Sequence, residues 1–200
     1  MVAKASRGNE AAKPVPSDGA WYADDIDRVI VSEEEIKQKV AELAKQVTAD
    51  YAGKQVLLVG VLKGAVMFMA DFARAVGIPV ELEFMAISSY GNRATSSGTV
   101  RILKDLDRDI SGRHVIVVED IVDSGLTLSW LLKNLSSRNP ASVDVVALFR
   151  KPDAVKVDVP VRYIGFDIPN EFVVGYGLDY GEHYRELPYV GVLKPEVYSR

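Results

Sequence analysis

The sequence predicts an α/β protein built on a central, mainly parallel twisted sheet flanked by helices. Continuous apolar runs at 56–62 and 115–118, and the segment 143–149, which is apolar except for Asp144, are typical of strands buried on both faces of such a sheet. Apolar residues at helical spacing lie between these runs. The resulting order of strands and helices indicates the α/β class.

Composition narrows the range of functions. The apolar fraction of 48% is ample for a buried core, and the net charge of −4 argues against nucleic acid as the main partner. The absence of cysteine excludes disulfides and thiolate chemistry. His114 and His183 are too few and too isolated for a histidine-based metal site.

Length and the N-terminal residues suggest a simple organisation. Residues 20–200 fit a single domain, preceded by a mobile tail at 1–19 that is rich in Ala, Lys, Ser, Pro and Gly. No apolar run approaches the ~20 residues needed to cross a membrane, and the N-terminus lacks the apolar core of a signal peptide. We therefore expect a cytoplasmic protein that does not associate with membranes.

The first expected helix begins at a capping box, in which Ser32 and Glu35 satisfy each other's backbone N–H groups. Its apolar positions recur at helical spacing: Ile36, Val40, Leu43, Ala44, Val47 and Tyr51. A buried strand at 56–62 and a helix at 65–76, ended by Gly77, follow.

The rest of the chain alternates in the same way. The remaining expected elements are a strand at 80–84, a long flexible loop at 88–98, short strands at 99–103 and 161–166, strands at 115–118 and 143–149, a helix to about Ser137, and strand and loop at 172–192. In such sheets ligands bind at the carboxyl ends of the strands. Lys63, Lys151 and the segment 119–127 all fall there.

The segment from Val115 to Thr127 contains the largest group of candidate functional residues. Its strand ends in Glu119 and Asp120, and the short loop 123–127 leads into a helical pattern. A strand, a loop and a helix in this order point backbone N–H groups at an anion. Taken alone, Asp123-Ser124-Gly125 is also compatible with an ordinary turn or helix cap.

The whole segment resembles the phosphoribosyl-pyrophosphate signature of the type I phosphoribosyltransferases. That signature has two acidic residues, two apolar residues, then Asp, Ser or Thr, Gly, any residue and Thr, and every position matches here. Leu126 fills a position often held by Lys in relatives. The resemblance extends from about Asp24 to Val192 and implies that family's fold, with a small hood lobe of C-terminal and N-terminal residues, mainly 166–192.

The resemblance implies roles for the signature residues. The loop Asp123, Ser124, Gly125, Leu126 and Thr127 would hold the 5′-phosphate, and Glu119 and Asp120 would bind the ribose hydroxyls and a sugar-bound Mg²⁺. Asp123 would be the general base that takes the proton from purine N7. Without the family context, Glu119 and Asp120 remain compatible with a solvated acidic pair at a strand end.

Further residues match the family's diphosphate site. Lys63 and Gly64 resemble its pyrophosphate loop, in which a peptide that is often cis aims N–H groups at the diphosphate, and Arg185 matches its diphosphate-binding arginine. An isolated Lys63 would otherwise be a surface residue in a strand-to-helix turn.

The segment 166–180 resembles the purine-binding segment of the hypoxanthine-guanine enzymes of this family. By that resemblance Phe172 stacks on the purine, the Val173 backbone reads the base edge, and Asp179 contacts the base and a second Mg²⁺. Lys151 would donate to the carbonyl oxygen of a 6-oxopurine. The alternative is that Phe172 and Val173 are core residues, Asp179 a turn residue and Lys151 a solvated lysine.

Ser89 and Tyr90 match the Ser-Tyr pair of the family's mobile lid, which would exclude water from the site. The alternative is a surface loop without a role.

The resemblance as a whole implies purine salvage with Mg²⁺ as cofactor. The enzyme would convert hypoxanthine and guanine, with phosphoribosyl pyrophosphate, to IMP and GMP plus diphosphate, and it would form a homodimer or homotetramer. A nucleic-acid-binding regulator of the same fold would need a basic surface, which the net charge of −4 disfavours. A nucleotide enzyme of another class is disfavoured because the chain has no G-x-x-x-x-G-K-[ST] loop, and Gly175-Tyr176-Gly177 lacks the full dinucleotide spacing.

Overall fold

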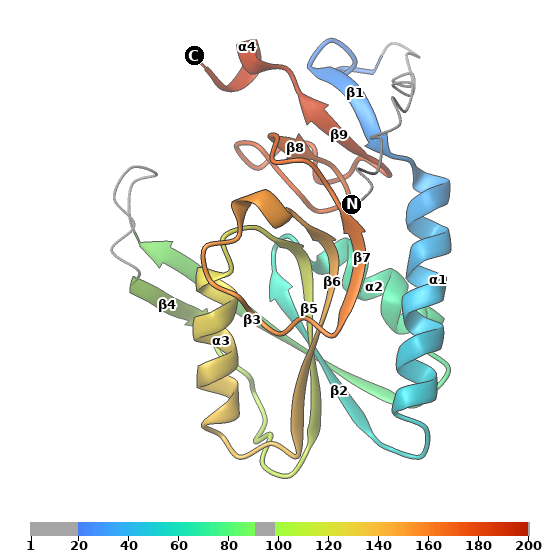
Figure 1. Ribbon diagram of the computed structural model, residues 1–200, viewed down its shortest axis with the longest axis vertical. Coiled ribbons are helices and arrows are strands. Elements are labelled where there is room, and N and C mark those ends of the chain that lie inside the picture. The colour runs from blue at the N-terminus through green and yellow to red at the C-terminus, as the bar shows by residue number, and fades with distance from the viewer. Residues whose placement is uncertain (1–19, 91–98, 200) are drawn as a thin grey trace, which may run out of the picture.

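The computed structural model describes residues 20–90 and 99–199, and a six-stranded sheet forms its centre (Figure 1). The strands lie in the order β4-β3-β2-β5-β6-β7. Their bounds are Val56–Leu62 (β2), Val80–Tyr90 (β3), Thr99–Lys104 (β4), His114–Val122 (β5), Ser142–Arg150 (β6) and Tyr163–Asp167 (β7). All neighbouring pairs are parallel except β3 with β4. The predicted α/β class and mainly parallel sheet are confirmed.

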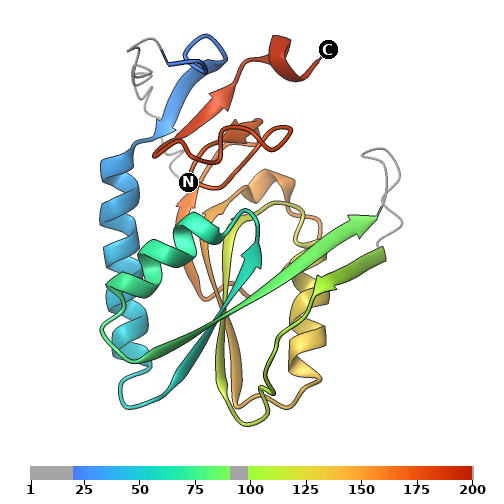
Figure 2. The same cartoon turned by 180° about the vertical axis from the view of Figure 1, so that it is seen from behind.

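Helices cover both faces of this sheet. The helices α1 (Glu33–Asp50) and α2 (Val66–Ala75) pack on one face, and α3 (Leu126–Ser136) packs on the other (Figure 2). Alternate residues of β2 serve the two layers, because Leu58 joins the core under α1 and α2 whereas Leu57 and Val59 join the core under α3. A strand that is buried on both sides has to be apolar at every position, which explains the continuous run in the sequence.

The start of α1 is the predicted capping box. The Ser32 Oγ accepts the Glu35 N–H at 3.4 Å, and the Ser32 N–H donates to Glu35 Oε2 at 2.8 Å. The Gly77 N–H beyond α2 donates to Thr48 Oγ1 at 2.9 Å, which ties the end of α2 to α1. Among the described residues, no helix is both long and apolar enough to cross a bilayer.

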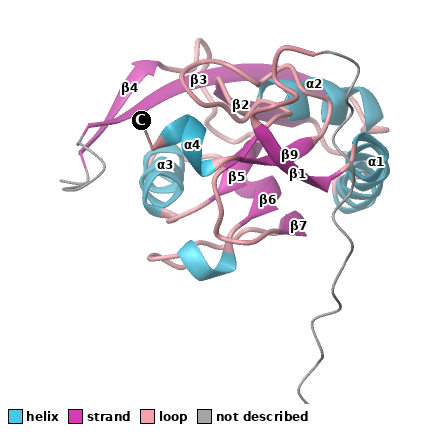
Figure 3. Cartoon of the chain, turned by 90° about the horizontal axis from the view of Figure 1, so that it is seen from above, coloured by secondary structure: helices cyan, strands magenta, loops and turns pink. Residues whose placement is uncertain are grey.

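A second, three-stranded sheet lies beyond the carboxyl ends of β2, β5, β6 and β7 (Figures 1 and 3), and we call it the hood. Its antiparallel order is β1 (Ile26–Val31), β9 (Val190–Leu193) and β8 (Val173–Val174). The short helix α4 (Pro195–Tyr198) follows β9. The sequence analysis did not predict β1 or α4, and the division into a tail at 1–19 and a domain at 20–200 stays a prediction, since residues 1–19 lie outside the described residues.

One predicted loop is partly wrong. Residues 88–90 belong to β3, where Ser88 pairs with Arg101 and Tyr90 with Thr99 of β4. Pairing with β4 satisfies the backbone groups of this polar segment, so its composition did not prevent a strand. The remainder of the predicted loop, 91–98, lies outside the described residues, as do the side chains of Ser89 and Tyr90. A single 3₁₀ turn at Pro152–Ala154 (η1) follows β6.

Candidate active site

Two neighbouring pockets lie at the carboxyl ends of the central strands. The first, which we call the loop pocket, has a volume of about 200 Å³ and is lined by Val61, Ile87, Glu119, Ile121, Val122, Asp123, Ser124, Gly125, Thr127 and Leu128. The second, the hood pocket, has a volume of about 260 Å³ and is lined by Asp120, Ile121, Asp123, Lys151, Phe172, Val173, Leu178 and Asp179. Because Ile121 and Asp123 line both, the pockets meet at the end of β5.

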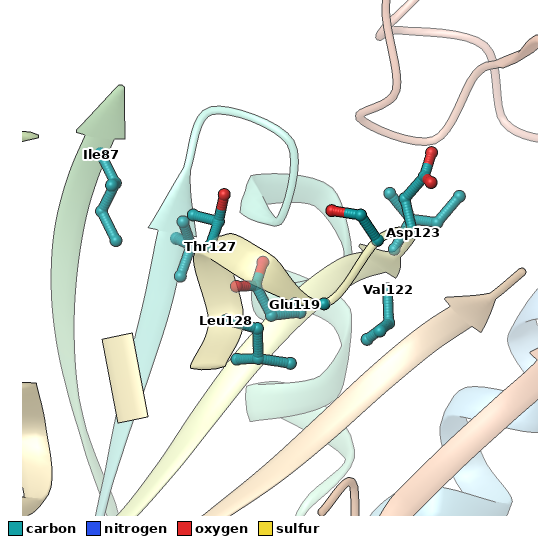
Figure 4. A pocket seen from close by; sticks show the side chains of 10 residues that line it. Ile87, Glu119, Val122, Asp123, Thr127 and Leu128 are labelled. Carbon is teal, nitrogen blue, oxygen red and sulfur yellow. The ribbon is translucent and has the colours of Figure 1, made fainter. Parts of the chain in front are cut away.

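The loop after β5 forms one wall of the loop pocket, in which Glu119, Asp123 and Thr127 surround the same space (Figure 4). Gly125 has a φ of +78°, and a Cβ there would clash with the Val157 carbonyl oxygen. The Ser124 carbonyl accepts the N–H groups of Lys156 at 3.0 Å and Val157 at 3.1 Å. The loop is therefore held from behind while its residues and the first turn of α3 face the pocket.

Glu119 and Asp120 divide between the two pockets. Successive residues of a strand point to opposite faces, so Glu119 lines the loop pocket and Asp120 the hood pocket. Burial, with the charge of Asp120, raises the pKa of Glu119 well above its usual range. Burial likewise raises the pKa of Asp120 to about 6, against the opposing charge of Arg185. A cation placed against these buried oxygens would favour their charged forms.

The acidic side chains suit a magnesium ion only in part. Glu119, Asp120 and Asp179 supply the hard oxygen donors that Mg²⁺ prefers. Across residues 20–90 and 99–199, however, no three His, Cys, Asp or Glu side chains gather into one metal site. The donor set therefore fits an ion that one or two carboxylates hold and that a bound phosphate compound and water complete.

Lys151 lines the hood pocket close to Asp123, which lines both pockets. Its side chain is buried, and its Nζ lies 3.6 Å from Asp123 Oδ2. The Lys151 N–H donates to the Val122 carbonyl at 2.9 Å, which extends the contact between β5 and the end of β6. A buried ammonium group needs a polar partner, and an incoming carbonyl oxygen in the hood pocket would supply a second one.

The predicted purine-binding residues converge on the hood pocket. Phe172 stacks on Tyr198 of α4 at a centroid distance of 4.9 Å and meets the edge of Tyr180 at 5.7 Å. Val173, which is buried in β8, and Asp179 also line this pocket. Val173 and Leu178 line the pocket while also belonging to the core, so for Val173 the core position and the pocket position hold together.

The predicted diphosphate-binding residues gather on the Asp120 side. The peptide bond between Leu62 and Lys63 is cis, and a Cβ on Gly64 would clash with the Asp120 carboxylate. The Lys63 Nζ lies 2.6 Å from Glu182 Oε2. The Arg185 guanidinium donates to the Gly177 carbonyl at 2.6 Å and pairs with Asp179 at 2.9 Å.

The structure thus places ten of the predicted site residues in the linings of the two pockets. The others whose side chains it describes, Lys63, Gly64, Leu126 and Arg185, lie outside these linings. The roles given to all of them stay predictions. Ser89 and Tyr90 stay predictions because their side chains are not described. Sequence reasoning missed Tyr198, which backs Phe172, and Glu182, which contacts Lys63. Neither has a motif of its own, and only the folded chain brings them to the site.

Comparisons with known proteins agree with this geometry. The family model described as a phosphoribosyl transferase domain matches residues 30–181. A hypoxanthine-guanine phosphoribosyltransferase of Mycobacterium tuberculosis is 58% identical over 184 residues, covering 89% of this chain and 91% of the relative. The Dictyostelium discoideum protein of the same name is 53% identical over 176 residues, covering 86% and 98%.

A solved structure gives the same result. A hypoxanthine phosphoribosyltransferase of Staphylococcus aureus superposes with a TM-score of 0.88 at 44% identity, covering 92% of this chain and 100% of that one. The type I phosphoribosyltransferase fold of this chain, with its mainly parallel sheet, is therefore shared with that structure. The chain belongs to the phosphoribosyltransferase family.

Proposed function

We propose that the chain is a hypoxanthine-guanine phosphoribosyltransferase of purine salvage. It transfers the 5-phosphoribosyl group of phosphoribosyl pyrophosphate to N9 of hypoxanthine or guanine, giving IMP or GMP plus diphosphate. The observation that carries the proposal is the position of Asp123, which lines both pockets and lies 3.6 Å from the buried Lys151 ammonium. Sugar and base sites that meet at a carboxylate suit a reaction that joins a sugar to a base.

The loop pocket is assigned to the ribose 5-phosphate. Residues 123–127, including the exposed Leu126, offer hydroxyls and the N–H groups at the start of α3 to the phosphate oxygens. Glu119, in the same pocket, is placed for the ribose hydroxyls. Its negative charge also favours the positive charge that grows on the sugar as diphosphate leaves.

The hood pocket is assigned to the purine. Lys151 donates to the 6-oxo group, and Asp123 accepts the N7 proton as the new bond forms at N9. Phe172, held by its stack on Tyr198, presents an aromatic surface to the base, and the Val173 backbone and Asp179 contact its edge. Adenine carries an amino group where Lys151 requires an acceptor, so it is rejected.

The space beside Asp120 is assigned to the diphosphate. Gly64, packed against Asp120, brings the backbone close to the ligand, and Lys63 and Arg185 supply positive charge. Glu119 and Asp120 would hold a sugar-bound Mg²⁺ and Asp179 a second one, and these ions would neutralise the charge of the leaving diphosphate. By the family resemblance we also keep Ser89 and Tyr90 as lid residues.

One assay tests the proposal. Purified protein, Mg²⁺ and phosphoribosyl pyrophosphate are mixed with hypoxanthine, guanine, xanthine or adenine, and nucleotide formation is followed by absorbance. We expect IMP and GMP and no AMP. Asp123→Asn should lower turnover by about 10²-fold or more, because it removes the proton acceptor while keeping the shape of the side chain. Formation of nucleotide with adenine only, or with none of the four bases, would contradict the proposal.

We further propose a cytoplasmic homodimer or homotetramer. The family resemblance supports the oligomer, and phosphorylated substrates, which do not cross membranes freely, support the location. Light scattering coupled to gel filtration should give a mass of two or four times 21.9 kDa. A monomer mass at working concentrations would contradict the first part.

A further inference from the structure

Glu182 contacts both Lys63 and Arg185, the two basic residues that we propose bind the diphosphate. Its Oε2 lies 2.6 Å from Lys63 Nζ, and its Oε1 lies 3.2 Å from Arg185 Nη2. Each oxygen of this carboxylate therefore serves one cation. The two cations come from distant parts of the chain, one before α2 and one in the loop between β8 and β9.

The other contacts of Arg185 do not depend on Glu182. Arg185 donates to the Gly177 carbonyl at 2.6 Å and pairs with Asp179 at 2.9 Å, and its side chain is mostly buried. In the described part of the chain its buried Nε has no hydrogen-bond partner. Arg185 is thus fixed without Glu182 and still has a donor to offer to a ligand.

Glu182 and Lys63, in contrast, are side chains that move at little cost. They are 60% and 66% exposed, and both are long and unbranched. The hydrogen bond from Lys63 is the main cause that lowers the pKa of Glu182, so the carboxylate is charged at neutral pH. An exposed pair of this kind is weak, and a ligand with more negative charge can displace it.

We propose that Glu182 occupies the place of the diphosphate between Lys63 and Arg185 and has to swing away when the diphosphate group binds. Glu182 is in this view a positioning residue that sets diphosphate affinity by competing for the two cations. In the unliganded enzyme it holds Lys63 near Arg185. When diphosphate has formed, its return weakens the hold on the product. This inference rests on the proposed function.

The test is binding of inorganic diphosphate, in the presence of Mg²⁺, to the full chain by titration calorimetry. Glu182→Gln should bind diphosphate about two- to fivefold more tightly, the size expected for removal of one exposed ion-pair competitor. Its dissociation rate, from stopped-flow displacement, should fall by a similar factor. Binding of GMP, whose phosphate lies in the loop pocket, should stay unchanged and reports that the variant is folded.

Glu186→Gln is the matched control. Glu186 is exposed, follows Arg185 directly and forms no ion pair within the described residues. Its removal changes the net charge as Glu182→Gln does, so an equal gain in both variants would overturn the inference. An unchanged or weaker affinity in Glu182→Gln would also overturn it.

A double substitution tests the route of the effect. In Lys63→Met the contact with Glu182 is already lost, so adding Glu182→Gln should give less than half of the gain measured in the wild type. The full gain in the double variant would overturn the proposed competition for Lys63. Failure of the wild type to bind GMP or diphosphate would instead contradict the proposed function, so the two failures are distinguishable.

Discussion

A buried charged residue at this site lowers the free energy of unfolding while it serves the proposed reaction. Asp120 is a buried carboxylate whose pKa is raised to about 6, mainly by burial, from an ordinary value of 3.8. Between these two values the folded protein holds more protons than the unfolded chain does. The free energy of unfolding therefore falls as pH rises through that window, and the full penalty is present above it.

Asp120→Asn should remove this penalty. The amide keeps an acceptor for the Ile121 N–H, which donates to Asp120 Oδ1 at 2.7 Å. We expect the free energy of unfolding to rise by about 1–3 kcal/mol at pH 8 and by little at pH 4, measured by urea denaturation. Asp153→Asn, a change at an exposed acid in η1, is the control. An equal gain at both pH values would contradict burial as the cause.

A second prediction at the residue scale concerns Lys151 and the preference for hypoxanthine over adenine. Its buried ammonium group has Asp123 at 3.6 Å and faces the hood pocket, so it needs an acceptor on the base. Lys151→Gln should lower the ratio of kcat/KM for hypoxanthine over adenine at least about tenfold, because an amide also accepts from an amino group. The exposed Lys156→Gln should leave the ratio unchanged. The same ratio in both variants would remove Lys151 as the specificity residue.

At the scale of elements, the loop after β2 packs closely against the end of β5 and the loop after β8, and glycines make this possible. A Cβ on Gly64 would clash with Asp120, and a Cβ on Gly177 would clash with the Gly64 carbonyl oxygen. The backbones of the 62–65 loop, the end of β5 and the 175–187 loop are therefore stacked closely beside the proposed diphosphate site.

Gly64→Ala should separate these loops. We expect KM for phosphoribosyl pyrophosphate to rise at least about tenfold, since a shift of about 1 Å in a positioned site costs that much or more. Gly53→Ala is the control, because Gly53 has a φ of +77° but no atom within 4 Å of the added Cβ. Steady-state kinetics of both variants provides the measurement. A normal KM in Gly64→Ala would show that the loop tolerates the displacement.

Elements also show what could be predicted from the sequence. The strands β2, β5 and β6 were predictable because burial on both faces demands runs of apolar residues, which lie at 56–62, 115–118 and 145–149. The strand β1 was not, because Asp27 and Arg28 interrupt its pattern and its partner β9 is distant in the sequence. The strand propensity of a local segment does not indicate a pairing partner that is distant in the sequence.

In the candidate site, too, some residues were predictable from the sequence and others were not. Its motif residues were predictable because their spacing is specific, whereas Glu182 and Tyr198 reach the site through loop and helix positions that carry no local signal. The division of Glu119 and Asp120 between two pockets follows from β5 running to Val122. Had the strand been extended that far, its alternation alone would have separated the two carboxylates.

At the scale of the whole molecule, two cores cover the two faces of the main sheet. The core under α1 and α2 reaches into the hood through Val31, Val173, Val190 and Val192, and a third cluster lies within the hood. The hood cluster includes Val29 of β1 and is in contact with Phe172. The hood pocket therefore depends, at Phe172, on packing that the loop pocket does not share.

Val29→Asp should destabilise the hood more than it destabilises the main sheet. A charge buried in the hood core costs several kcal/mol and loosens the small sheet first. Hydrogen exchange should rise in 172–193 and stay low in 56–62, and KM for hypoxanthine should rise more than KM for phosphoribosyl pyrophosphate. The exposed Asp27→Asn is the control. Equal loss of protection in both regions would show that the hood and the main sheet unfold as one unit.

The pairing of β1 with β9 also orders events during synthesis. Ile26 pairs with Leu193, so β1 leaves the ribosome long before its partner does. The residues that line the loop pocket, and Lys156 and Val157 that support it, all precede β9, so this part can fold while translation continues. The hood pocket cannot, because β8 pairs with β9. Until β9 emerges, the nascent chain carries an unpaired strand with free backbone groups, the kind of edge that invites association with other chains.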